Sequence, residues 1–198
     1  FPAAKVHTGM DPAHGPARAE YRKAGLHLGV LDSQYANYLD EVARIPVRKG
    51  VEFRWASAGD APVVRDIVLA AWRPVYDAVR ARLGDELFAL SFDDVLERRA
   101  AELSAVAEED PDKVRLVEEK GECVGFAIVE DDPAKHLGLL RTVAVTPAAQ
   151  GRAVAAGLCM DAFDIFRERG LHYARLMARL GEVTWESRQL AWNVGLYR

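Results

Sequence analysis

The sequence predicts an α/β fold in which a mixed central sheet is flanked by helices. Half of the 198 residues are hydrophobic and 28% are charged, which is the composition of a globular domain. From residue 51 onward, runs with strand-like alternation are interspersed with runs that carry apolar residues at helical spacing. The resulting order, β-α-α-β-β-β-α-β-α, favours helices layered on a sheet over a helical bundle or a β-sandwich.

The first predicted elements are a strand and two helices. Residues 51–57 (VEFRWAS) alternate as a short strand does. We expect Asp60 to cap the following helix, with Pro62 in its first turn. The apolar face of this helix consists of Val64, Ile67, Val68, Ala71, Trp72 and Val75. A second helix is predicted over about residues 86–109, either continuous or restarting near Phe92.

Three strands come next. The β-rich runs 114–119 and 123–131 surround the glycine-containing turn EKGE, and this pattern predicts an antiparallel hairpin. Residues 137–145 (LGLLRTVAV) are predicted to form the third strand.

The clearest helix covers residues 151–169, with charges near its end and Gly170 after it. Its apolar face is formed by Val154, Leu158, Ala162, Ile165 and Phe166. A strand over 172–180 and a helix over 185–198 complete the predicted order.

Charge and motifs exclude several classes of function. The net charge of −4 argues against a broad nucleic-acid surface. No apolar run is long enough to cross a membrane, and the first residues contain no apolar signal core. The absence of P-loop, GxGxxG, HExxH, GxSxG and CxxC motifs disfavours nucleotide hydrolases, Rossmann oxidoreductases, zinc proteases, serine hydrolases and thiol redox enzymes, and no metal site is predicted. Cys123 and Cys159 lie in apolar segments, so we expect two reduced thiols and a cytoplasmic location.

Residues 143–158 (VAVTPAAQGRAVAAGL) place a glycine and an arginine between a strand and a helix. A helix N-terminus carries unpaired N–H groups and a partial positive charge, so it attracts anions. Gly151 lets a ligand approach the backbone closely, and Arg152 adds charge-assisted hydrogen bonds. The segment is therefore a candidate pyrophosphate site. The alternative is an ordinary strand-to-helix connection with a solvated arginine.

The same stretch resembles the acetyl-CoA-binding motif of the GNAT acyltransferase superfamily, in which a strand and a V-x-P-type bend precede Q/R-x-x-G-x-G/A at the start of a long helix. The resemblance implies a GNAT-like fold and acetyl-CoA as cofactor. It implies that the backbone around Val143, Ala144 and Val145 holds the pantetheine arm. The residues implied to hold the pyrophosphate are Gln150, Gly151, Arg152, Ala153, Val154 and Ala155. Ala153 departs from the family, which usually has glycine there; its methyl group is compatible with a helical backbone but approaches the phosphates.

The N-terminal residues resemble the end of a GNAT domain. Residues 16–31 (PARAEYRKAGLHLGVL) are similar to its helix-to-strand corner, and residues 27–39 to its closing strand. We therefore divide the chain into the C-terminal part of one GNAT-like domain (1–40), a linker (41–51) and a GNAT-like domain lacking its last strands (52–198). Either the chain is a piece of a tandem protein, or the N-terminal piece completes the second unit, in the same chain or in a homodimer. A coincidental likeness of two short helices is the third interpretation.

Acetyl transfer from a thioester to an amine requires a deprotonated amine, a donor for the oxyanion and an acid for the leaving thiolate. In the GNAT family the tyrosine of the LY motif often serves as that acid. Tyr197 matches it in the longer unit and Tyr21 in the shorter one. For Tyr197 the alternative is a half-buried aromatic residue near the chain end.

The base and the acceptor site are less clearly marked. The strand 137–145 lacks the carboxylate that many family members use as base. We interpret the nearby charges as solvated turn residues or surface histidines, namely Glu118, Glu119, Glu130, His136 and His172. Trp72 and Tyr76 are candidates to line the acceptor site, although aromatic residues at helical spacing usually belong to the core.

These observations predict an acyl-CoA-dependent N-acetyltransferase that acts on an amine of a small molecule or a peptide. The intact Gln150-Gly151-Arg152 and Tyr197 favour this prediction. The alternative is a non-catalytic GNAT-like domain that binds CoA or a partner protein, which Ala153 and the missing strand carboxylate favour.

Overall fold

The computed structural model describes residues 32–40, 42 and 44–179. These residues form one six-stranded sheet in the order β1-β6-β5-β4-β3-β2. Its strands are β1 (Asp32–Tyr38), β2 (Val51–Trp55), β3 (Val114–Glu119), β4 (Glu122–Asp132), β5 (Leu137–Val145) and β6 (Tyr173–Arg179). Neighbouring strands are antiparallel except β5 and β6, which are parallel, so the predicted mixed sheet is confirmed.

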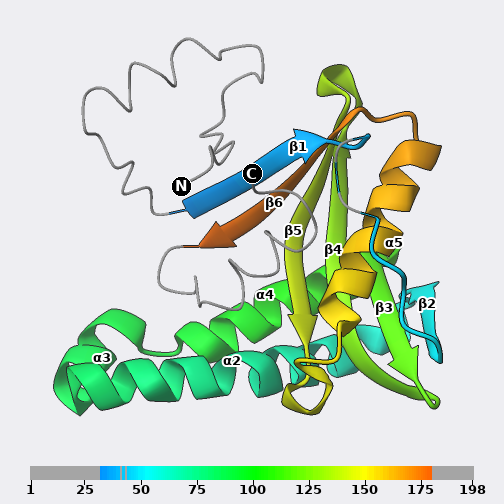
Figure 1. Ribbon diagram of the computed structural model, residues 1–198. Coiled ribbons are helices and arrows are strands. Elements are labelled where there is room, and N and C mark those ends of the chain that lie inside the picture. The colour runs from blue at the N-terminus through cyan, green and yellow to red at the C-terminus, as the bar shows by residue number, and fades with distance from the viewer. Residues whose placement is uncertain (1–31, 41, 43, 180–198) are drawn as a thin grey trace, which may run out of the picture.

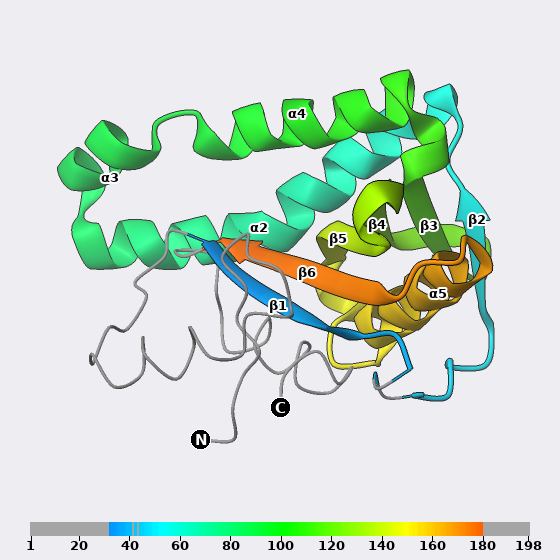
Figure 2. The same cartoon turned by 90° about the horizontal axis from the view of Figure 1, so that it is seen from above.

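Helices cover both faces of the sheet, which gives three layers (Figures 1 and 2). The helices α2 (Ala61–Leu83) and α4 (Val95–Glu109) run side by side on one face, and α5 (Val154–Glu168) lies on the other. The short helix α3 (Asp85–Phe92) joins α2 to α4 where this helical pair projects beyond the sheet.

The alternation of side chains along β4 divides the interior into two cores. Phe126 and Ile128 are fully buried against α2 and α4, whereas Ala127 and Val129 are fully buried against α5. Because successive strand residues point to opposite faces, a strand covered on both faces is apolar throughout. This explains the uninterrupted apolar run that the sequence shows in the second strand of the hairpin.

The helices predicted within the described residues are present, with different bounds. The first continues through Pro74 to Leu83 because it packs along α4, which offsets the backbone hydrogen bond that proline removes. The second is divided into α3 and α4, because Asp94 has a left-handed φ of 54° that no helix continues through. The restart near Phe92 is therefore confirmed, and the continuous helix over 86–109 is wrong.

β1 and the segment after it extend the sheet and bind α5. β1 pairs with β6 along its whole length. We call the described residues of 39–50 the strap; Figure 1 shows it running beside α5 from β1 to β2. Leu39 and Val42 of the strap are buried, and Arg167 of α5 donates a hydrogen bond to the carbonyl oxygen of Leu39 at 2.7 Å. The segment interpreted as a linker thus contributes to the core beside α5.

Several predictions fall on other parts of the chain. The N-terminal residues 1–31 and the helix predicted over 185–198 lie outside the described residues. Among the residues that are described, no helix is long and apolar enough to cross a membrane. Cys123 and Cys159 are free thiols, as expected, and full burial raises the pKa of Cys159 to about 12.

Candidate functional site

β5 separates from β6 halfway along its length. The parallel ladder joins only Leu137–Leu140 to β6. At the same point the β4–β5 register shifts between Ile128 and Val129, which leaves Arg141 as an extra residue in β5. A bulge of this kind increases the twist and bends the strand. β5 and β6 therefore diverge beyond the bulge, as Figure 1 shows.

The divergence leaves backbone groups of β5 without a ladder partner in the described strands. The N–H of Thr146 donates to the carbonyl oxygen of Val124 of β4 at 2.9 Å. In an antiparallel ladder alternate residues direct their N–H and C=O groups to the same partner, so Ala144 also faces β4. Val143 and Val145 therefore direct their N–H and C=O groups to the opposite edge of β5, with which β6 no longer pairs at this point. An extended ligand can hydrogen-bond to such an edge as an added strand does.

The segment after β5 ends in a helix N-terminus that no side chain caps. Gly151 and Ala153 both have left-handed backbone, with φ of 70° and 60°, so α5 begins at Val154 rather than at residue 151 as predicted. The N–H of Gly157 donates to the carbonyl oxygen of Ala153 at 3.0 Å. The N–H groups of the first helical turn before Gly157 have no intrahelical acceptor, and this turn contains no acidic residue. The N-terminus of α5 is therefore electropositive.

Ala153 occupies a backbone conformation that suits glycine. The expectation that its methyl group fits a helical backbone is wrong, because its φ is 60°. The left-handed conformation brings Cβ close to the following carbonyl oxygen and costs about 1–2 kcal/mol for residues other than glycine. The glycine usual in the family at this position thus has a conformational reason. Ala153 carries strain within residues 150–154, which we call the mouth of α5.

Arg152 is not a free solvated side chain. Its Nη2 lies 2.6 Å and 2.5 Å from the two carboxylate oxygens of Glu119, the last residue of β3. Arg48 of the strap binds the same carboxylate, with its Nη2 3.0 Å from Oε1. The Glu119 side chain is only 10% exposed, so its interpretation as a solvated turn charge is wrong. Sequence reasoning missed it because both partners are remote in the chain.

Of the other predicted site residues, only the two aromatic residues of α2 belong to the part of the chain that the structure describes. Tyr197 and Tyr21 fall outside the described residues. Trp72 is half-buried, with the Arg99 guanidinium 4.7 Å from its ring centre. Tyr76 is buried, and its ring centre lies 6.2 Å from that of Phe92. Both α2 aromatic residues thus pack between helices, and their contact with an acceptor stays a prediction.

The remaining titratable candidates are surface groups. Glu130 lies opposite Leu139 in the ladder, and Arg141 binds its carboxylate at 3.2 Å. His136 and His172 are exposed and stack with ring centres 4.7 Å apart at the start of β5 and β6. The mouth of α5 follows the opposite end of β5, so the histidines are remote from it, as the surface interpretation expected.

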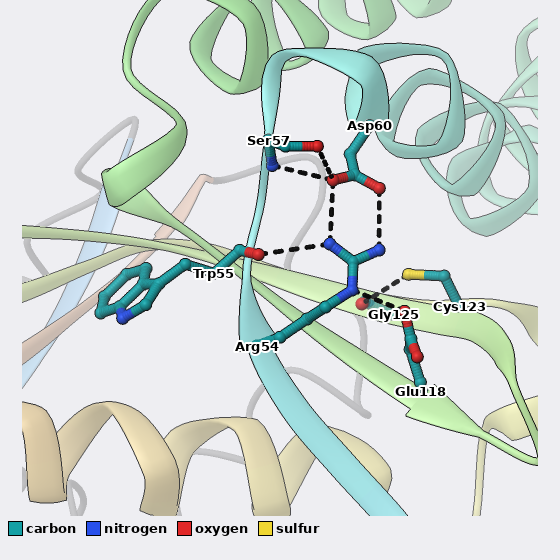
Figure 3. Close-up of polar contacts among 7 residues, drawn as sticks. All are labelled: Arg54, Trp55, Ser57, Asp60, Glu118, Cys123 and Gly125. Atoms are coloured by element: carbon teal, nitrogen blue, oxygen red, sulfur yellow. Dashed lines mark hydrogen bonds and ion pairs between the residues drawn. The ribbon is translucent and has the colours of Figure 1, made fainter.

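A second polar cluster joins β2 to α2 (Figure 3). Arg54 binds both carboxylate oxygens of Asp60 at 2.8 Å and Glu118 at 2.6 Å. Asp60 precedes α2 as predicted, but its side chain does not cap that helix; it accepts hydrogen bonds from the N–H and Oγ of Ser57 instead. The Arg54 guanidinium holds the pKa of Asp60 well below its usual range. Every charge in this cluster is paired, which is typical of a structural connection.

The family model described as Acetyltransferase (GNAT) family matches residues 72–182, more than half of the chain. The chain belongs to the GNAT acetyltransferase family. The matched region contains the bulged strand β5, the mouth of α5 and α5 itself. No protein of curated function matches the sequence significantly.

Solved structures show the same fold. The GCN5-related N-acetyltransferase from Sphaerobacter thermophilus is 19% identical, with a TM-score of 0.56 over 90% of this chain and 51% of that one. The chain thus spans about half the length of that protein. The PaiA N-acetyltransferase from Thermoplasma acidophilum, solved in complex with coenzyme A, is 15% identical, with a TM-score of 0.52 over 70% and 86% of the two chains. The ribosomal-protein-S18-alanine N-acetyltransferase from Escherichia coli is 16% identical, with a TM-score of 0.50 over 73% and 76%. These similarities confirm the predicted GNAT-like α/β fold.

Proposed function

We propose that this GNAT protein transfers an acetyl group from acetyl-CoA to an amine of a small molecule or a peptide. One observation carries the proposal: the edge of β5 at Val143 and Val145, which has no ladder partner among the described strands, leads into the N-terminus of α5, which no side chain caps. The extended pantetheine arm fits such a strand edge, and the pyrophosphate fits the N–H groups of the helix. The two sites follow each other along one continuous segment, as the two parts of the cofactor do.

The chemistry proposed for this site follows from the same backbone groups. We propose that the N–H of Val143 donates to the thioester carbonyl oxygen and stabilises the tetrahedral oxyanion, since it faces the edge of β5 opposite β4. The amine nitrogen forms the new bond to the acetyl carbon and releases a proton to water, the carbon–sulfur bond breaks, and the thiolate takes a proton. We assign that proton to Tyr197, with Tyr21 as the matching residue of the shorter unit. Trp72 and Tyr76 remain our candidates for the acceptor side.

Thermal unfolding with and without acetyl-CoA tests the proposal first. A ligand present at about a hundred times its dissociation constant adds roughly 2.7 kcal/mol to the stability of the folded state. For a chain of this length we expect the unfolding midpoint to rise by about 5–10 °C. Release of free CoA thiol in the presence of a panel of amines then tests catalysis. An unchanged midpoint at millimolar acetyl-CoA would contradict the proposed site.

A non-catalytic domain that binds CoA is the second candidate. One observation favours it: β5, LGLLRTVAV, carries no carboxylate that could serve as the base for the acceptor amine. A raised unfolding midpoint without thiol release from any amine in the panel would support this candidate over the enzyme.

A further inference from the structure

We propose that Arg48 and Arg152 form a two-arginine clamp for the phosphate groups of CoA, and that Glu119 occupies this clamp until the cofactor displaces it. This inference rests on the proposed function and deepens it. It adds Arg48 of the strap, which lies outside the β5–α5 segment, to the residues that bind the cofactor. It also identifies Glu119 as an acidic residue that lowers the affinity for the cofactor.

The geometry shows a carboxylate beneath two guanidinium groups. Glu119 is 10% exposed, whereas the side chains of Arg48 and Arg152 are 37% and 39% exposed. An anion that approaches from solvent therefore meets the two arginines before it meets the carboxylate. The N-terminus of α5, which begins one residue after Ala153, adds its own positive end to the same place.

Arg48 has an unused donor in this arrangement. Its Nη2 binds Glu119, but within the described residues its Nη1 is buried and has no hydrogen-bond partner. A guanidinium presents its N–H groups as a rigid fork that matches a phosphate bidentately. A phosphate group that takes the place of Glu119 frees the Arg48 side chain to turn and to donate from both Nη1 and Nη2, which the single carboxylate does not allow.

The exchange of anions is physically favourable. Both arginine side chains are more than a third exposed, so solvent screens their ion pairs with Glu119 and the arginines lose little when they leave it. A phosphate offers more negative charge and more acceptor oxygens than a carboxylate. Glu119 also lies directly opposite Glu122 in the β3–β4 ladder. When the arginines turn from Glu119 to a phosphate, the carboxylates of Glu119 and Glu122 face each other without the arginines beside them. Their repulsion is a cost of cofactor binding, so Glu119 opposes it.

Calorimetric titration of CoA against the whole chain and its Glu119→Gln variant tests the inference. We expect E119Q to bind CoA about fivefold more tightly, the factor that corresponds to one solvent-screened ion pair. Without ligand, E119Q should unfold at a lower temperature, because two arginines lose their partner. If Glu119 had only a structural role, its replacement would lower both the stability of the protein and its affinity for CoA. The matched control is Glu122→Gln, which removes the same charge from the opposite residue and should change the affinity less than about twofold.

Arginine variants give an independent test. Arg48→Gln should weaken CoA binding about fivefold, whereas Lys49→Gln, an exposed neighbour of the same charge, should change it less than about twofold. Titration with 3′-dephospho-CoA locates the contact: an Arg48 effect that disappears assigns the 3′-phosphate, and one that persists assigns the pyrophosphate. If E119Q does not fold, the comparison of R48Q with K49Q decides.

The outcomes separate the two proposals. Unchanged or weaker CoA binding by a folded E119Q, or equal affinities of R48Q and K49Q, would overturn the clamp while the proposed function stands. If neither the natural sequence nor E119Q binds CoA, the proposed function falls and the clamp falls with it. Binding by E119Q alone would support the clamp most directly.

Discussion

Replacement of Ala153 with glycine should stabilise the protein, although the same replacement weakens most helical positions. Ala153 has a left-handed φ of 60° at the start of α5. Relief of this conformation contributes about 1–2 kcal/mol. The greater freedom of glycine in the unfolded chain costs about 0.4–1 kcal/mol. The difference predicts a net gain of about 0.5–1 kcal/mol, which for a chain of this length raises the unfolding midpoint by about 1–4 °C.

Urea unfolding followed by tryptophan fluorescence measures this gain. The matched control is Ala101→Gly, at an exposed position in the middle of α4, which should lose about 0.5–1 kcal/mol. The two alanine-to-glycine variants should therefore shift stability in opposite directions. If A153G loses stability as A101G does, residue 153 has right-handed backbone and the geometry derived for the mouth of α5 is wrong.

Three further predictions test the packing and the charges. Gly138→Ala should lose about 1–3 kcal/mol in urea unfolding, because a Cβ there would lie 2.3 Å from the buried ring of Phe166; unchanged stability would contradict the close approach of α5 to β5. Because Arg54 holds the pKa of Asp60 well below its ordinary 3.8, their pair contributes stability above that value and loses it as the pH falls further. Asp60→Asn should therefore cost about 1–2 kcal/mol at pH 7 and clearly less at pH 2, measured by urea unfolding at both; an equal cost would contradict the ion pair. The fully buried Cys159 should resist alkylation at pH 8 until the protein is unfolded in urea, and rapid labelling in the native state would contradict its burial.

The strands were predictable because their signals are local. The hairpin of β3 and β4 follows from two apolar runs around a tight turn, and Lys120 and Gly121 have the left-handed φ values, 55° and 81°, that such a turn requires. The start of α5 was not predictable in the same way. Alanine favours helices, so the sequence gives no sign that Ala153 is held in left-handed backbone by the turn before it.

The packing of the strap against the core was not predicted, because the composition of the strap is typical of a linker. Charged residues, proline and glycine in residues 40–51 outweigh the apolar residues among them. Yet Leu39, Val42 and Ile45 recur every three residues, and all three pack against the core beside α5. That spacing was the available signal. It becomes decisive only when an apolar surface is known to lie opposite, and that surface is formed by a helix more than a hundred residues away.

The candidate site depends on the register of the whole sheet. Val51 pairs with Glu119 and Gly125 pairs with Val145, so three turns meet at one end of the strands. These turns contain Arg48, the end of β3 and the mouth of α5. A slip of a strand by one residue turns every side chain to the other face, so the ladders that bury the two cores also fix where the charges lie. The sequence motif supplies the mouth of α5, but Arg48 and Glu119 reach it only through strand pairing. The affinity that we propose for CoA therefore depends on the folded sheet as well as on the motif.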